Sequence, residues 1–532
     1  MYDVVVETAA GKLGGSRTDN VYVFRGVPYG ASTAGANRFR APQPREPWSG
    51  VRDATQFGAT APQRTHAEMA GTQPGHAEGE SRMSAFMQFL HGLAGDEPEQ
   101  GEDCLMLNIW TAALDTDKSR AVMVWLHGGA FDSGSGSWPL YEGTPLASRD
   151  DVVVVTLNHR LGPLGFLYLD EIGGERYAGS GNAGMLDIIS ALQWIRDNIA
   201  QFGGDPSKVM VYGDSGGASK TAALLGMPAA QGLFHRAAVM SGPYTRARSR
   251  DTAQTLTLQL LEHLQIPAAE FHRLHDVPYP LLLEAAAKLQ ISIDAGLASA
   301  ASPEAFMPMQ PVVDGTTLPA HPLEPVGSPY GADVTVMVGS TQDDMKMMML
   351  SMPWFGRMDD AGLDAFAQAT FGALAEPMIA AYRKIYPQAS PTDIACQCVT
   401  DRVMWAGGID WVERKIAGGG APVYMYRFDY TTPALGGVLG ATHGGEVPFA
   451  MNNYSYTPMA GQRPENAMMG RVISEAFVRF AHSGNPNHAD LPEWKPYSLA
   501  ARNTLIFDVE CRSEADPRAE LRVLFEQTRH SS

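Results

Sequence analysis

One short unit recurs along the chain: an apolar, β-branched run, a turn rich in glycine, proline or asparagine, and then apolar residues at helical spacing. Several runs are apolar almost throughout, which is typical of strands buried on both faces. Such strands alternating with helices predict an α/β fold with a mostly parallel sheet and helices on both faces. The expected strands are "AVMVWL", "DVVVVTL", "KVMVYG", 333–340 and 421–430, and the expected helices are 185–202 and 218–227.

The 532 residues contain no internal repeat and no linker-like low-complexity segment. We therefore expect residues 1–532 to form one large domain with insertions between the elements of the sheet. An irregular, lid-like insertion is expected at about 62–101, and a variable helical region at about 245–330. The segment 345–357 is a second candidate for a lid or pocket wall.

Charge and composition exclude several function classes. A formal net charge of −18 without a Lys/Arg cluster disfavours nucleic acid and anionic lipid as partners. We find no stretch that is apolar for long enough to cross a bilayer and no signal peptide at the N-terminus, so a cytoplasmic location is expected. The four cysteines form no disulfide framework, and neither they nor His66 and His76 have a metal-ligand pattern around them, so no metal is expected.

The stretch "VYGDSGGAS" places Ser215 between glycines, directly after an expected buried strand and before an expected helix. This is the context of a nucleophile elbow, in which a strained turn presents a serine hydroxyl. An ordinary glycine-rich turn would also fit these residues.

A second glycine-rich turn, "WLHGGAF" at 125–131, also follows an expected buried strand. Small residues let backbone N–H groups point at a negatively charged oxygen, as acyl transfer requires. A simple strand-end turn is the structural alternative.

Several long motifs in order make the sequence similar to the type-B carboxylesterase and cholinesterase family of α/β-hydrolases. They are "FRGVPYG", "EDCLMLNIW", "NHRLGPLGFL", "GNAGMLDIISALQWIRDNIAQFGGDPSKVMVYGDSGGAS", "APVYMYRFDY", "HGGEVPF" and "LPEWKPYSLAARNTLIFDVECR". The similarity runs from about Val4 to about Phe525 and is weakest at 62–100 and 245–330.

The resemblance implies a catalytic triad of Ser215 as nucleophile, His443 as base and Asp344 as acid. Asp344 stands where the family usually has glutamate, and Met345 stands where it usually has glycine. The neighbouring Asp343 is the rival for the acid.

The resemblance also implies an oxyanion hole made by the N–H groups of Gly129, Ala130 and Gly216, with Gly128 shaping the turn. The implied activity is that of a serine carboxylesterase, which hydrolyses small to medium or aryl esters through an acyl-enzyme and needs no cofactor. An amidase or carbamate hydrolase using the same triad, and a non-catalytic binding protein of the same fold, are the alternatives.

Departures from the family narrow these expectations. Ala61 stands where secreted members have the cysteine that pairs with the one in "EDCL", so Cys104 is expected to be a free, buried thiol. Residues 62–101 contain no tryptophan, which disfavours a specialist for choline esters. The Met-rich segments 345–355 and 450–459 would either line a pliable pocket or fill the core.

Overall fold

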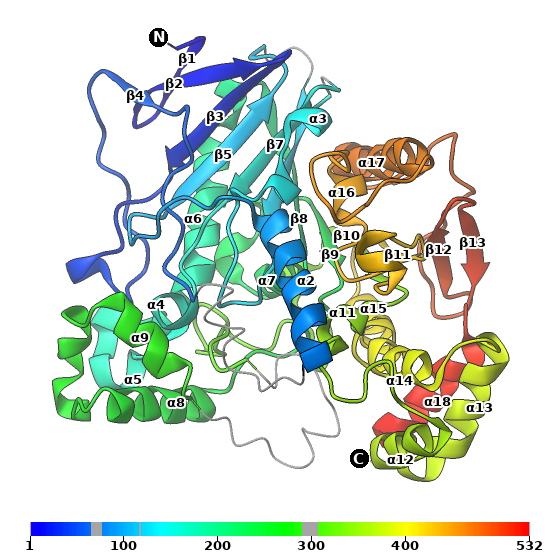
Figure 1. Cartoon of the computed structure of the whole chain (residues 1–532). Helices are drawn as coiled ribbons and strands as arrows, with labels where there is room; N and C mark the ends of the chain where they lie inside the picture. The colour runs from blue at the N-terminus through cyan, green and yellow to red at the C-terminus, as the bar shows by residue number, and fades with distance from the viewer. Residues whose placement is uncertain (1, 65–76, 116–118, 150, 290–306, 531–532) are drawn as a thin grey trace.

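The computed structural model describes residues 2–64, 77–115, 119–149, 151–289 and 307–530. In this part of the chain, thirteen strands form one sheet (Figure 1). Their spatial order is β1 (Val4–Thr8), β2 (Gly11–Thr18), β3 (Val21–Pro28), β5 (Met106–Thr111), β7 (Val152–Leu157), β6 (Arg120–Leu126), β8 (Gly204–Asp214), β9 (Arg236–Met240), β10 (Thr335–Thr341), β11 (Val423–Phe428), β12 (Asn503–Phe507) and β13 (Arg512–Ala515), with β4 (Val51–Asp53) beside β2.

The strands from β7 to β12 pair in parallel, whereas the strands outside them pair antiparallel, except for β4, which pairs in parallel with β2. All five strands expected from the sequence are present. Strand β9 was not expected, because its sequence "RAAVM" is short and holds two alanines and an arginine, which do not favour strands. Tertiary pairing with β8 and β10 makes this segment a strand.

Strand β6 shows how the core is divided. Its residues are all buried, and they alternate between two separate apolar clusters, one on each face of the sheet. Val122, Val124 and Leu126 pack with helices α6 (Ala183–Asn198) and α7 (Gly216–Leu224) on one face. Met123 and Trp125 pack with α17 (Asn466–Ser483) on the other. The near-continuous apolar runs therefore do mark strands covered on both faces, as expected.

Further helices surround the sheet, and the four nearest the C-terminus in Figure 1 have an apolar cluster of their own. These four are α12 (Asp360–Phe371), α13 (Ala375–Ile385), α14 (Pro391–Thr400) and α18 (Ala519–His530). The others are α3 (Thr144–Ala147), α4 (Gly162–Phe166), α5 (Asp170–Gly173), α8 (Arg250–His263), α9 (Tyr279–Ala286), α11 (Lys346–Met349), α15 (Ala406–Ala417) and α16 (Val447–Ala450).

The insertion expected to be irregular at 62–101 contains a helix, α2 (Ala77–Ala94), so that part of the prediction was wrong. Phe86, Phe89, Leu90 and Leu93 follow the helical spacing i, i+3, i+4 and i+7, and they pack against the cluster that contains Trp125. Residues 65–76, which include His66, lie outside the described residues. The expected helical region from 245 is occupied by α8 and α9, and its part at 290–306 also lies outside.

A buried ion pair joins the loop after β7 to helix α6. Arg160 and Asp187 are 1% and 0% exposed, and the guanidinium donates to both carboxylate oxygens at 2.6 and 2.8 Å. The backbone N–H of Arg160 donates to the same carboxylate, and Nη1 donates to the carbonyl of Arg40. Removing one partner of such a pair destabilises the protein, because the other charge stays buried without compensation.

We expect Asp187→Ala to lower the stability by about 3–5 kcal/mol, because it strands the Arg160 charge in the core. The control is Asp197→Ala, whose partner Arg196 is 54% exposed, and which should cost less than about 1 kcal/mol. The measurement is the urea midpoint of unfolding followed by tryptophan fluorescence. Equal midpoints for the two variants would contradict the structural role given to this pair.

Candidate active site

Ser215 lies in a sharp turn between β8 and α7. Its φ of 58° and ψ of −122° are unfavourable for a residue with a side chain, and its own N–H donates to the carbonyl of Met240 at 2.9 Å. Ser215 is partly exposed, whereas the residues on both sides of it are buried. The turn therefore presents this one side chain while its backbone is tied to the end of β9.

Three glycines make the turn possible. A Cβ built on Gly217 would lie 2.0 Å from the carbonyl oxygen of Leu126, and one on Gly216 would lie 2.3 Å from that of Ala130. A Cβ on Gly213 would lie 2.5 Å from the same Leu126 oxygen. The G-x-S-x-G spacing is therefore required here by the close approach of the turn to the end of β6.

His443 and Asp344 are in contact. Nδ1 of His443 lies 2.5 Å from Oδ1 of Asp344, which is fully buried. The second oxygen, Oδ2, accepts hydrogen bonds from Ser241 Oγ at 2.6 Å and from the Thr341 N–H at 2.8 Å. Because an ionised carboxylate only accepts, Nδ1 carries the proton and Nε2 is left free to take another.

Asp343 lies beside Asp344 but has different partners. Its Oδ2 accepts from the N–H of Ala441 at 2.9 Å, and its own N–H donates to the Ala441 carbonyl at 2.8 Å. Its Oδ1 accepts from Gln397 at 3.0 Å. Asp343 thus fastens the loop that carries His443, whereas the carboxylate that touches the imidazole is that of Asp344.

The second ring nitrogen of His443 is on the side of the serine turn. Nε2 is buried and has no hydrogen-bond partner among the described residues, and it lies 3.8 Å from Oδ2 of Asp214, the neighbour of Ser215. No hydrogen bond between Nε2 and Ser215 Oγ is recorded within the described ranges. The imidazole is therefore held by Asp344 at Nδ1, whereas Nε2 has no hydrogen-bond partner among the described residues.

Two further carboxyl groups are buried around the imidazole. Burial raises the pKa of Asp214 to about 7 and the pKa of Glu446 well above 4.5. The carboxyl group of Glu446 accepts a hydrogen bond from Tyr426 Oη at 3.2 Å. Burial by itself would lower the pKa of His443, but the negative charges of Asp214 and Asp344 outweigh it and raise that pKa. The protonation states of these three groups therefore depend on one another.

The turn at 128–130 packs against the serine turn. Gly129 and Ala130 have φ of 82° and 54°, so both residues adopt the left-handed backbone conformation. The N–H groups of Gly129, Ala130 and Gly216 donate no recorded hydrogen bond in the described part of the chain. Because the backbones of Gly216 and Ala130 touch, these donors lie together beside Ser215.

Sequence reasoning missed Ser241 and the Tyr426–Glu446 pair. Ser241 follows β9 and is followed by a glycine, so a polar residue at the carboxyl end of a parallel strand was the available signal. Glu446 lies within the quoted motif "HGGEVPF", but its burial beside Asp214 appears only in the structure.

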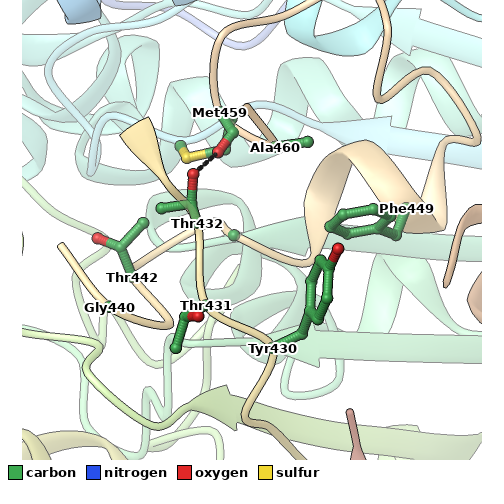
Figure 2. A pocket seen from close by; sticks show the side chains of 9 residues that line it. Tyr430, Thr431, Thr432, Gly440, Thr442, Phe449, Met459 and Ala460 are labelled. Carbon is green, nitrogen blue, oxygen red and sulfur yellow. Dashed lines mark hydrogen bonds between the residues drawn. The ribbon is translucent and has the colours of Figure 1, made fainter. Parts of the chain in front are cut away.

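Figure 2 shows the residues that line a hollow at the loop that carries His443. Its lining includes Tyr430, Thr432, Thr442 and Phe449, and the hydroxyl of Thr432 donates to the carbonyl of Met459 at 2.7 Å. Thr442, directly before His443, lines this hollow, whereas neither Ser215 nor His443 does.

The Met-rich segments are mainly core. Met347, Met349, Met451 and Met459 are buried in the apolar cluster that contains Trp125, whereas Met348 and Met352 are exposed. Within the described ranges, no group of three or more His, Cys, Asp or Glu side chains is placed to hold a metal ion. The helices of this part of the chain also lack the combination of length and apolar character that crossing a bilayer requires.

Comparisons with known proteins agree with the motifs. A sequence model of the carboxylesterase family matches residues 2–522. The para-nitrobenzyl esterase of Bacillus subtilis is 34% identical over 523 residues, which cover 97% of each chain. The phenmedipham hydrolase of Pseudarthrobacter oxydans is 34% identical over 93% of this chain and 92% of its own.

Solved structures give the same result. The carboxylesterase of Geobacillus stearothermophilus superposes with a TM-score of 0.79 at 35% identity, covering 98% of this chain and 99% of that one. An esterase from Clostridium hathewayi, described as hydrolysing aliphatic aromatic polyesters, has a TM-score of 0.80 at 32% identity and covers 99% of both chains. The chain therefore belongs to the carboxylesterase family, and it is a carboxylic ester hydrolase with the α/β-hydrolase fold.

Proposed function

We propose that Ser215, His443 and Asp344 are the catalytic triad of this esterase. The observation that carries the proposal is the imidazole of His443, bound to Asp344 at Nδ1 and unoccupied at Nε2 beside the strained Ser215 turn. We further propose that the N–H groups of Gly129, Ala130 and Gly216 form the oxyanion hole. These three N–H groups have no hydrogen-bond acceptor within the described residues, and they lie where the turn at 128–130 meets the Ser215 turn.

In this mechanism Ser215 Oγ attacks the ester carbonyl carbon while its proton passes to His443 Nε2. The carbonyl π electrons move to the oxygen, where the three N–H groups stabilise the charge. Collapse breaks the bond to the alcohol, which leaves with the proton from Nε2. Water then attacks the acyl-enzyme, gives a proton to Nε2 and releases the acid as Ser215 regains its proton. Asp344 orients the ring and stabilises its charged form.

The substrates we propose are small to medium or aryl carboxylic esters. The relatives' names support this range, since one is called a para-nitrobenzyl esterase and another a phenmedipham hydrolase. The second name supports carbamate hydrolysis as a further candidate activity, because the same triad can attack a carbamate carbonyl.

We also propose that the protein works in the cytoplasm. All four cysteines are free, including Cys104, which is buried as expected, and free thiols fit a reducing compartment. Cell fractionation with an antibody to the protein would test this, and recovery from the periplasm or medium would contradict it.

The triad predicts unequal effects for two adjacent aspartates. Ser215→Ala should lower kcat by about 10⁴-fold or more, and Asp344→Asn by about 10³–10⁴-fold, because the imidazole loses its orientation and charge partner. Asp343→Asn changes a carboxylate that bonds Ala441 and Gln397 but not the imidazole, so kcat should fall by no more than about tenfold. The assay is hydrolysis of p-nitrophenyl butyrate.

Asp343→Asn is the matched control, since it changes the same residue type one position away. A kcat loss as large for Asp343→Asn as for Asp344→Asn would contradict the assignment of the acid. Undiminished turnover by Ser215→Ala would contradict the nucleophile.

The charge of Asp214 predicts a shift in the pH profile. Asp214→Asn removes a negative charge 3.8 Å from Nε2, so the pKa of His443 falls. Because the base works only when neutral, the acid limb of kcat/KM should move to lower pH, by about one unit. Asp410→Asn, which removes a carboxylate bonded to Arg414 on α15, should leave the limb in place. A shift of the acid limb to higher pH in Asp214→Asn would contradict the predicted direction.

Substrate preference separates ester from carbamate hydrolysis. We expect p-nitrophenyl butyrate to have a kcat/KM at least about tenfold above that of an N-aryl carbamate, and an anilide to be slower still, because poorer leaving groups raise the barrier to collapse of the tetrahedral intermediate. The three values are measured with one preparation, with Ser215→Ala as the blank. A carbamate value above that of the ester would favour the second candidate.

A further inference from the structure

A lysine that the mechanism above does not use is buried beside residues 127–130, which we call the oxyanion loop. Lys220, on helix α7, is fully buried, and its Nζ donates to the carbonyl oxygen of His127 at 3.0 Å. His127 directly follows strand β6 and directly precedes the turn at 128–130. The hydrogen bond therefore joins α7 to the first residue of the oxyanion loop.

The helix directs this side chain toward the site. Gly216 and Lys220 are four residues apart on α7, so they lie on the same face of the helix. Helical side chains also lean toward the helix N-terminus, which here is the Ser215 turn. The ammonium thus lies on the side of α7 that carries the Gly216 N–H.

Few groups neutralise the charge of Lys220. The rings of His127 and His159 stack with centroids 5.0 Å apart, and the Nε2 atoms of both are buried without a hydrogen-bond partner among the described residues. Burial lowers the pKa of both histidines well below 6.5, so both are neutral. Among the described residues, no carboxylate oxygen lies within ion-pair distance of Lys220 Nζ. The negative charge of Asp132, which is further away, raises the pKa of Lys220 but does not outweigh burial.

We propose that Lys220 is a positioning residue for the oxyanion hole. Its N–H···O bond to the His127 carbonyl fixes the turn that presents the Gly129 and Ala130 donors. Its positive charge is held at the carbonyl of the residue that directly precedes this turn, in a low-dielectric interior where charges act over longer distances than in water. The charge therefore stabilises the negative oxygen of the tetrahedral intermediate more than the neutral ester. This inference rests on the proposed oxyanion hole and deepens it.

A buried ammonium is costly, and burial lowers the pKa of Lys220 to about 7. An anion at the oxyanion hole would favour the charged form of Lys220, and the charged lysine would in turn stabilise that anion. No proton transfer between Lys220 and the substrate is involved.

The test is Lys220→Met, which keeps the length and apolar stem of the side chain but removes the donor and the charge. Lys415→Met is the matched control. Lys415 is also buried, its Nζ also donates to a backbone carbonyl, that of Ala332 at 3.1 Å, and burial lowers its pKa to about 8. It lies on α15, beside the loop that precedes β10 and away from the oxyanion loop.

With p-nitrophenyl butyrate, we expect Lys220→Met to lower kcat by about tenfold or more while KM stays within about twofold. The affinity for an alkyl trifluoromethyl ketone, which forms an anionic tetrahedral adduct with serine, should fall by a similar factor. The affinity for the corresponding methyl ketone should not change. Lys415→Met should leave all four values near those of the parent.

A variant that is folded by circular dichroism and keeps the parent's kcat and ketone affinities would overturn the proposal. So would a change in KM alone, or equal kcat losses for the two lysine variants. Lys220→Gln, which keeps a donor without the charge, replaces Lys220→Met if that variant does not fold. Failure of both Lys220 variants to fold, with Lys415→Met folded, would show that the residue is structural only.

Ser215→Ala is run alongside to separate the two proposals. Turnover that survives Ser215→Ala would overturn the proposed catalytic serine and its oxyanion hole. Turnover lost in Ser215→Ala but retained in Lys220→Met would overturn the Lys220 inference alone.

Discussion

The candidate site depends on a close backbone contact between the β8–α7 turn and the end of β6. Cβ atoms at Gly213, Gly216 and Gly217 would come within 2.0–2.5 Å of backbone atoms at Leu126 and Ala130. Only residues without side chains let the two chain segments approach this closely. The contact places the serine turn and the oxyanion loop together, and it forces Ser215 into its unfavourable conformation. Removing the contact would separate the nucleophile from the donors.

The parallel order of the central strands then brings the remaining groups to the same edge of the sheet. Ser215 follows β8, Ser241 follows β9, and Asp344 follows β10, and these three strands are neighbours. The carboxylate of Asp344 receives hydrogen bonds from Ser241 and from the Thr341 N–H, so its position is fixed before it meets His443. Asp343 in turn fastens the histidine loop, since its carboxylate accepts from the N–H of Ala441 and its own N–H donates to the Ala441 carbonyl. Adjacent aspartates thus serve the same imidazole in different ways.

Buried charge around this edge is arranged by sign. The carboxyl groups of Asp214 and Asp344 lie beside the imidazole, where negative charge favours the imidazolium that forms during proton transfer. Lys220 lies on α7, which follows the serine turn, and donates to the carbonyl of His127 next to the proposed oxyanion hole, where positive charge favours an oxyanion. Charge separation in the transition state, with a cation on His443 and an anion on the substrate oxygen, matches this arrangement.

The sequence by itself determined the local features. Apolar runs predicted the central strands, the G-x-S-x-G turn predicted the position of Ser215, and long motifs predicted the family, because each depends on residues close together in the chain. Tertiary structure decided which carboxylate meets His443, that "RAAVM" is a strand, and that Ser241 and Lys220 reach Asp344 and His127. The three side-chain contacts join residues 93 to 103 positions apart, and the strand depends on pairing with β8 and β10, so no local pattern encodes them. Helix α2 is the exception, since its apolar spacing was present in a segment expected to be irregular.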